Sequence, residues 1–379
     1  MNGSRVQTAN RDEQLTGSAG PDFVAVRAVT ATRPRRTVDY ESIALVVGGI
    51  AFVAVVLVAP FAFWGRDMPI AGRGSAGEFA AIAGAIAAAL GFAGARILVA
   101  RSTRDPQERA VARYHWFDLV ALSVAHGTIA LLGWLGAATI FEYSFVGATL
   151  YPSPAVMIAA ATTALSAYVA FLSGASLSPR QLSLVLAVFL VVGMVTAMLS
   201  ASDPSWWELN LSALGMTHDT SSLAFNFTLI VSGVIVTTIA RFGTAALPAA
   251  TPQARSRRTT VRVMFVLLGV LLSCVGIFPV DRFFLLHNTV ATGMAVVFAV
   301  LVLGTPWLMP SMRLAFVVLG YVFVAGIVGL ALLFAIGVYN LTAVELVASA
   351  LIFGWIILFL RNVGTARQAR PVRGTASGS

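Results

Sequence analysis

Lysine is absent from this chain of 379 residues, so all 25 of its basic residues are arginines. Cysteine occurs once, at Cys274 inside an apolar run, which excludes an internal disulfide and leaves the redox compartment undetermined. Charged residues make up only 11% of the chain, whereas soluble domains carry about 25%. Because 58% of the residues are hydrophobic and the mean hydropathy is +0.86, the sequence predicts an integral membrane protein.

Recognisable catalytic and cofactor motifs are missing as well. The four histidines form no His-x-x-x-His or His-Glu-x-x-His spacing, and a catalytic zinc ion needs three protein ligands. No phosphate loop, Gly-x-Gly-x-x-Gly fingerprint or cysteine motif occurs. Ser212 precedes His218 in a connecting segment, but this spacing does not by itself bring a base within reach of a nucleophile. We therefore predict no metal and no cofactor, and the sequence favours a role other than that of an enzyme.

Long apolar runs dominate what is present. A bilayer core of about 30 Å requires roughly 20 apolar residues per helix. By this measure the fold class is all-α, a polytopic transmembrane bundle of about ten spans. The expected spans are 43–64, 79–100, 117–139, 154–175, 181–200, 223–242, 261–279, 283–304, 313–337 and 341–361.

The chain divides into four segments by composition. Residues 1–40 are polar and contain arginines, which predicts a disordered cytoplasmic tail. Residues 41–180 hold four spans, residues 181–361 hold six, and residues 362–379 predict a second disordered cytoplasmic tail. The first apolar run is too long and too far from the N-terminus for a cleaved signal peptide, so we expect it to be retained.

The arginines predict the orientation of the chain, because cytoplasmic loops carry an excess of basic residues. With the N-terminus inside, nearly all arginines fall in the two tails and in the loops around 101–116, 176–180, 241–260 and 305–313. Only Arg66, Arg73 and Arg282 fall on the opposite side. An even number of spans then places both termini in the cytoplasm, in the plasma (inner) membrane. The net charge of +9 is explained by this placement, so we predict no nucleic-acid partner.

Polar residues gather at the outer ends of the later spans, around the stretch 276–293. An ionisable group at the rim of a membrane segment is costly and is a candidate for function. His287 lies roughly 6 Å below the outer end of its helix, at 1.5 Å per residue. We expect it to form a pocket with Asp281, either handling a proton or binding a head group; the alternative is a histidine that ties a short turn in place. The candidate pocket residues are Asp281, His287, Asn288, Asn226, Ser212, Asn210, Asp219, His218 and Glu345.

Two further features concern the helices themselves. His126 lies near the middle of the third span and is a secondary candidate, for which a hydrogen bond to another helix is the competing explanation. Small residues recur at intervals of three and four in the second span, which favours close packing of helices. The connection from Ser205 to Gly215 is semi-apolar, and we expect a short amphipathic helix at the membrane surface.

The second half of the chain resembles a known family. The segments NLSALG (210–215), FNFTLIVSGVI (225–235) and GIFPVDRFFLLHNTVA (276–291) are similar to the family called domain of unknown function 998. The resemblance covers about residues 185–360, and the first four spans fall outside it. It implies a polytopic bacterial membrane protein without an established activity.

Three hypotheses for the function follow. The first is that the protein binds or moves a lipid or other amphiphile of the cell envelope through the outer pocket, with membrane lipids as its partners. The second is an intramembrane lipid hydrolase that uses the same His and Asp residues. The third is a non-catalytic accessory subunit that docks a protein partner in a cell-envelope complex.

Overall fold

A computed structural model describes residues 39–102, 116–216, 219–245 and 247–368. Ten helices in these ranges are long and apolar enough to cross a membrane, which confirms the predicted all-α polytopic bundle. They are α1 (Tyr40–Ala62), α2 (Ala76–Ser102), α4 (Trp116–Ser144), α5 (Pro152–Ala175), α6 (Pro179–Leu199), α7 (Thr220–Ala245), α8 (Pro252–Ile277), α9 (Phe284–Leu303), α11 (Leu314–Ala335) and α12 (Leu341–Gln368). The shorter elements are β1 (Met68–Pro69), β2 (Thr149–Leu150), η1 (Trp206–Glu208), η2 (Leu211–Gly215) and α10 (Thr305–Leu308).

Several helices extend beyond their apolar runs. Helix α8 begins at Pro252 rather than at 261, because Thr251 caps it and the polar residues that follow are compatible with a helix. Thr251 accepts a hydrogen bond from the backbone N–H of Ala254, and Pro252 occupies the first helical position. Helix α12 continues to Gln368, so residues 362–368 are helical. Hydropathy therefore locates the part of a helix inside the membrane and not the ends of the helix.

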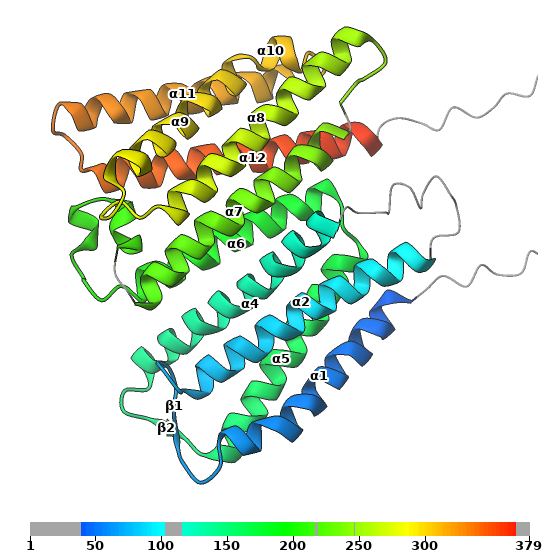
Figure 1. The fold of residues 1–379 in the computed structure, drawn as a ribbon, viewed down its shortest axis with the longest axis vertical. Helices are drawn as coiled ribbons and strands as arrows, with labels where there is room; N and C mark the ends of the chain where they lie inside the picture. Colours follow the sequence, from blue (N-terminus) through cyan, green and yellow to red (C-terminus); the bar gives the residue numbers. More distant parts are fainter. Residues whose placement is uncertain (1–38, 103–115, 217–218, 246, 369–379) are drawn as a thin grey trace, which may run out of the picture. The chain divides into compact units, whose positions relative to one another are not determined.

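The first four long helices form one packed group, in which α5 contacts α1 and α2, and α2 also packs against α4 (Figure 1). The small residues of α2 are buried at this contact, as the sequence predicted. A Cβ atom on Gly91 would lie 2.8 Å from the carbonyl oxygen of Ala167, and one on Gly174 would lie 2.8 Å from that of Phe92. The α2–α5 crossing therefore depends on glycine at both positions.

In the second group, α7 packs against α6 and α8, and α8 packs against α9. Gly233 of α7 faces Gly269 of α8 so closely that a Cβ on either residue would overlap the carbonyl oxygen of the other. Gly233 and Thr237 of α7 thus lie at the contact with α8. Trp355 of α12 is fully buried and its ring lies against Phe265, Phe298 and Phe316, which ties α8, α9, α11 and α12 together.

Helix α4 joins the two groups. It packs against α6 and α7, and the hydroxyl of Thr196 on α6 donates a 2.9 Å hydrogen bond to the carbonyl oxygen of Leu132 on α4. Figure 1 shows β1, β2 and the η1–η2 segment at one end of the bundle, and the start of α1 and the end of α12 at the other. Consecutive long helices therefore run in alternating directions between these two ends, as expected for ten consecutive crossings of a membrane.

Candidate functional site

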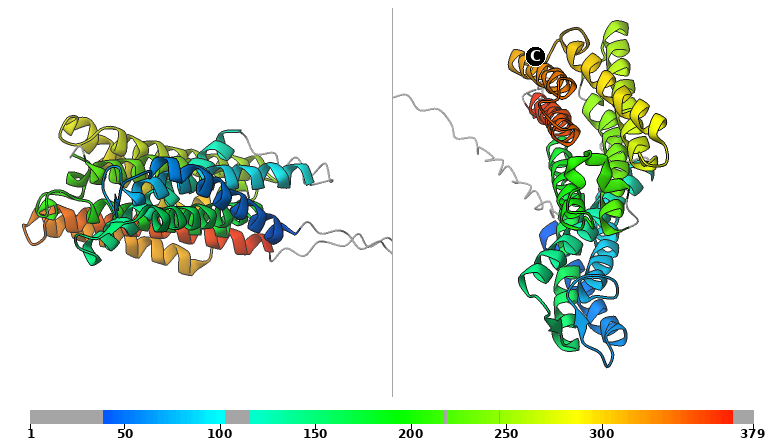
Figure 2. Two further views of the ribbon diagram at one scale, coloured as in Figure 1. Left: turned by 90° about the horizontal axis from the view of Figure 1, so that it is seen from below. Right: turned by 90° about the vertical axis from the view of Figure 1, so that its left-hand side faces the viewer.

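A cavity of about 170 Å³ lies among the later helices, at the end that carries η2. The residues that line it belong to α6, η2, α7, α8, α9 and α12. Figure 2 (right) shows α8 and α9 as one pair of helices and α11 and α12 as another. Its polar lining residues are Ser212, His287, Asn288, Glu345 and Ser349. Its apolar lining residues are Met194, Leu211, Phe225, Leu229, Leu272, Val275, Ala291, Met294, Ala295, Ala348, Ile352 and Phe353. A small polar set at one end of an apolar chamber is typical of ligand sites.

His287 lies in the first turn of α9 and is almost completely buried. Its Nδ1 atom lies 2.7 Å from the carbonyl oxygen of Phe278, and its Nε2 atom lies 3.1 Å from the hydroxyl oxygen of Ser212. A carbonyl oxygen only accepts hydrogen bonds, so Nδ1 carries the proton. When the ring is neutral, Nε2 therefore accepts a hydrogen bond from the hydroxyl of Ser212. The imidazole is held at both nitrogens and presents an edge to the cavity.

Ser212 is placed by η2, a stretch of 3-10 helix rather than the amphipathic surface helix expected for Ser205–Gly215. Four of the five residues in η2 are buried: Leu211, Ala213, Leu214 and Gly215. Backbone that is not α-helical needs hydrogen-bond partners inside the protein when it lies at membrane depth. The Glu345 carboxylate supplies them: it accepts a 2.6 Å hydrogen bond from the N–H of Leu211 and another from the N–H of Ser212. These bonds fold the segment inward, against α7 and α12.

Asn226 holds the other end of η2. Its side-chain amide donates a 3.1 Å hydrogen bond to the carbonyl oxygen of Gly215. The hydroxyl of Ser221 lies 3.4 Å from the carbonyl oxygen of Leu214. A Cβ on Gly215 would lie 2.6 Å from the side-chain oxygen of Asn226, so a larger residue would separate the two. Asn226 therefore supports the cavity without lining it.

The structure gives the predicted pair of His287 and Asp281 different partners. Asp281 is exposed and lies 4.0 Å from the guanidinium of Arg282, while His287 bonds Ser212 and Phe278. A short connection that places Asp281 close in sequence does not turn its carboxylate inward. Asp281 is absent from the cavity lining.

The remaining candidates have separate positions. Asp219 caps α7, because its carboxylate accepts hydrogen bonds from the N–H of Ser222 at 3.0 Å and from the hydroxyl of Ser202 at 2.6 Å. Asn210 directly precedes η2 and lies outside the cavity lining. Asn288 is exposed and borders the cavity. His218 lies outside the described residues.

His126 makes the same kind of contacts as His287 but borders no comparable chamber. Its Nδ1 atom lies 2.7 Å from the carbonyl oxygen of Leu122, and its Nε2 atom lies 2.8 Å from the hydroxyl of Ser173 on α5. The ring stacks on Phe92 with centroids 4.2 Å apart. The Nδ1 contact lies within α4, whereas the Nε2 contact joins α4 to α5, which supports the explanation by a hydrogen bond between helices.

Ser349 is a lining residue that the sequence reasoning missed. It follows Glu345 by one helical turn on α12, so the two side chains lie on the same face. A glutamate and a serine four residues apart in an apolar span are the signal that could have identified it.

The described residues contain no group of three or more His, Cys, Asp and Glu side chains placed to hold a metal ion.

The contact between Ser212 and His287 has the geometry of a nucleophile beside its base. Acyl transfer also needs hydrogen-bond donors for the developing oxyanion. The N–H groups of Leu211 and Ser212, which would be the nearest backbone donors, are bonded to Glu345. This arrangement suits the binding of a polar group better than acyl transfer.

Comparison of the chain with protein-family models, with curated proteins and with solved structures finds no match.

Proposed function

We propose that this membrane protein binds a lipid or other amphiphile of a bacterial cell envelope, with the polar head at Ser212, His287 and Glu345. The observation that carries the proposal is the juxtaposition of these three side chains at one end of a mostly apolar cavity. Met294, Ile352 and Phe353 line the cavity as well and would contact the hydrocarbon part of the ligand.

The size and charge of the cavity narrow the class of ligand. Its 170 Å³ is below the roughly 300 Å³ of small ligand pockets, so it takes a head group or a chain end while the rest of the amphiphile stays in the lipid. A carboxylate in the lining repels phosphate, whereas the oxygens of Ser212 and Glu345 can accept hydrogen bonds from a donor on the ligand. His287 fixes the Ser212 hydroxyl, because its two nitrogens are bonded to Phe278 and Ser212. A hydroxyl- or amine-bearing head group therefore fits best.

The resemblance to the family called domain of unknown function 998 is part of the proposal. Two residues of its motifs, Ser212 and His287, meet at the cavity although they are far apart in the sequence. The same residues thus carry both the resemblance and the binding site.

The binding test compares two buried histidines that have matching hydrogen bonds. Replacing His287 or Ser212 with Ala is expected to lower the amount of co-purifying amphiphile by about tenfold, equivalent to about 1.4 kcal/mol, because each change removes a hydrogen bond from the head-group site. His126→Ala, the matched control, should leave retention unchanged. The measurement is native mass spectrometry of the full chain in mild detergent, with the retained amphiphile identified by fragmentation.

Equal retention in the His287 and His126 variants would contradict the proposal. The contact between Ser212 and His287 also favours a second function, a lipid hydrolase with Ser212 as the nucleophile. Release of fatty acid from an ester lipid by the purified protein, abolished by Ser212→Ala, would establish that function in place of simple binding.

We further propose that both termini are cytoplasmic and that the cavity lies on the outer side of the plasma (inner) membrane, because arginines concentrate at the opposite ends of the helices. With Cys274 replaced by Ala, a cysteine at Glu208 should react with a membrane-impermeant maleimide on intact cells. A cysteine at Arg257 should react only after the cells are opened. The reverse pattern would overturn both the orientation and the extracytoplasmic site.

A further inference from the structure

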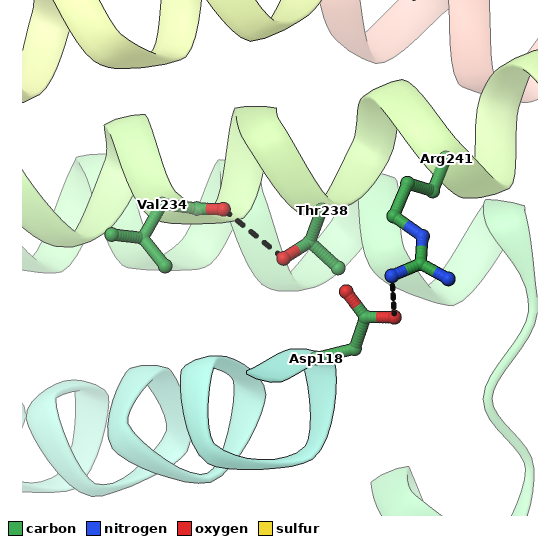
Figure 3. A network of polar contacts seen from close by, with 4 residues as sticks. All are labelled: Asp118, Val234, Thr238 and Arg241. Atoms are coloured by element: carbon green, nitrogen blue, oxygen red, sulfur yellow. Dashed lines mark hydrogen bonds and ion pairs between the residues drawn. The ribbon is translucent and has the colours of Figure 1, made fainter. Parts of the chain in front are cut away.

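A second polar cluster lies at the end of the bundle opposite η2. Asp118, in the first turn of α4, is 2% exposed, and its carboxylate lies 3.4 Å from the guanidinium of Arg241 near the end of α7 (Figure 3). Thr238 lies beside this pair, and its hydroxyl donates to the carbonyl oxygen of Val234 at 3.1 Å. The carboxylate of Asp118 thus fixes one guanidinium at the junction of α4 and α7.

Two more arginines reach this region from α8. The Nε atom of Arg262 donates a 3.1 Å hydrogen bond to the hydroxyl of Thr244 on α7, which holds the guanidinium against the end of that helix. Arg258 precedes it by one helical turn on the same face. Arg262 is within electrostatic range of both Arg258 and Arg241. Helices α7 and α8 therefore bring three guanidinium groups into the same region.

Within the residues that the structure describes, the cluster keeps a net positive charge. Three arginines and Asp118 sum to +2, and no carboxylate pairs with Arg258 or Arg262 in the ranges that the structure describes. Like charges brought together repel each other, and packing alone gives no reason to gather them. Arginine guanidinium groups match the oxygens of a phosphate in geometry as well as in charge.

The depth of the cluster matches the head-group layer. Thr244 is next to the last residue of α7, and Arg262 lies where the polar start of α8 gives way to its apolar run. Arg258 and Arg262 are partly buried, as is Arg257, whereas Arg255 nearby is exposed. Arg262 is distinguished by its hydrogen bond to Thr244 on the neighbouring helix. Placement of arginines for topology alone requires neither partial burial nor convergence from two helices.

We propose that Arg241, Arg258 and Arg262 form a binding site for a phosphate group, supplied by an anionic phospholipid of the adjacent leaflet. Asp118 orients Arg241 and Thr244 orients Arg262, so that their remaining N–H donors face the phosphate. The site differs in charge from the cavity at Ser212 and His287 and lies at the other end of the helices.

The test uses the purified full chain and phosphatidylglycerol, with phosphatidylcholine as the uncharged comparison. Replacing both Arg258 and Arg262 with Ala is expected to weaken binding of phosphatidylglycerol by roughly tenfold or more, measured by native mass spectrometry, because each change removes charge-assisted hydrogen bonds to the phosphate. The matched control replaces the exposed Arg255 and Arg313 with Ala, which removes the same charge from the same side of the membrane. It should change binding less than twofold.

An equal loss in both double variants would reduce the effect to net charge and overturn the proposal, as would no loss in either. Inorganic phosphate in the millimolar range distinguishes the source of the ligand. If it displaces phosphatidylglycerol from the wild-type chain, the site recognises phosphate in general; if it does not, the lipid is required. Should the double variant fail to fold, Arg258→Ala alone removes one guanidinium and leaves the bond between Arg262 and Thr244 intact.

Discussion

Leucine in place of Gly269 is expected to separate α7 from α8 and to lower the melting temperature of the purified protein by roughly 5 °C or more. A Cβ at this position would overlap the carbonyl oxygen of Gly233 and the hydroxyl of Thr237. Backbone atoms cannot rotate away, so the helices themselves must move. Overpacking costs about 1–3 kcal/mol, and a change that forces two backbones apart lies at the upper end of this range. Each kcal/mol corresponds to about 2–4 °C in domains of about 150–250 residues, so a cost of about 3 kcal/mol gives roughly 5 °C or more.

The matched control is Gly329→Leu on α11, where an added Cβ meets nothing within 4 Å. This variant should melt within roughly 1 °C of the wild type, since scattered surface changes cost little. Helices α7 and α8 both line the cavity through Leu229 and Leu272, so Gly269→Leu should also release the retained amphiphile. A melting temperature unchanged by Gly269→Leu would show that the crossing is looser than the structure describes.

Removing the carboxylate of Glu345 is expected to have the second large effect, because one side chain holds both η2 and the cavity. In Glu345→Ala the N–H groups of Leu211 and Ser212 lose their acceptor. A buried donor left without a partner costs about 1–3 kcal/mol. Movement of η2 also displaces Ser212 from His287, so retention of the amphiphile should fall at least about tenfold along with the melting temperature.

Two further variants separate positioning from charge. Glu345→Gln keeps an oxygen that can accept the bond from Leu211, so it should retain η2 in place and preserve most of the stability. If the head group is amine-bearing, Glu345→Gln should still weaken its binding, since the negative charge is gone. Glu208→Ala, a change of the same type at an exposed position of η1, should alter neither quantity. If Glu345→Ala behaved like Glu208→Ala, η2 would not depend on α12.

The candidate site could be predicted only in part from the sequence. Depth in the membrane placed Ser212, His287, Asn288 and Glu345 at the same level, and the structure brings these four around one cavity. Depth does not determine the direction in which a side chain points. The sequence therefore predicts Asp281 as a pocket residue together with His287, but Asp281 is exposed in the structure.

The connection between the fifth and sixth spans shows the same limit. Its tryptophans and semi-apolar composition predict a short helix on the membrane surface. Nothing within the segment predicts the inward turn of η2. That turn depends on two side chains outside the segment. The carboxylate of Glu345, 134 residues from Leu211, accepts a hydrogen bond from the N–H of Leu211, and the amide of Asn226 on the next helix donates one to Gly215. A buried backbone without regular structure is stable only when such partners arrive from elsewhere in the fold.

The sequence by itself determined the ten membrane-spanning helices. The length and hydropathy of each run are local properties, and they alone decide whether a helix can cross the hydrocarbon core of a bilayer. Only the tertiary structure decided which polar groups meet. Ser212 and His287 are 75 residues apart, and the pairing of Asp118 with Arg241 joins the third span to the sixth. Close crossings at glycines set these distances, and an added methyl group at such a crossing is a clash that no local property of the sequence reveals.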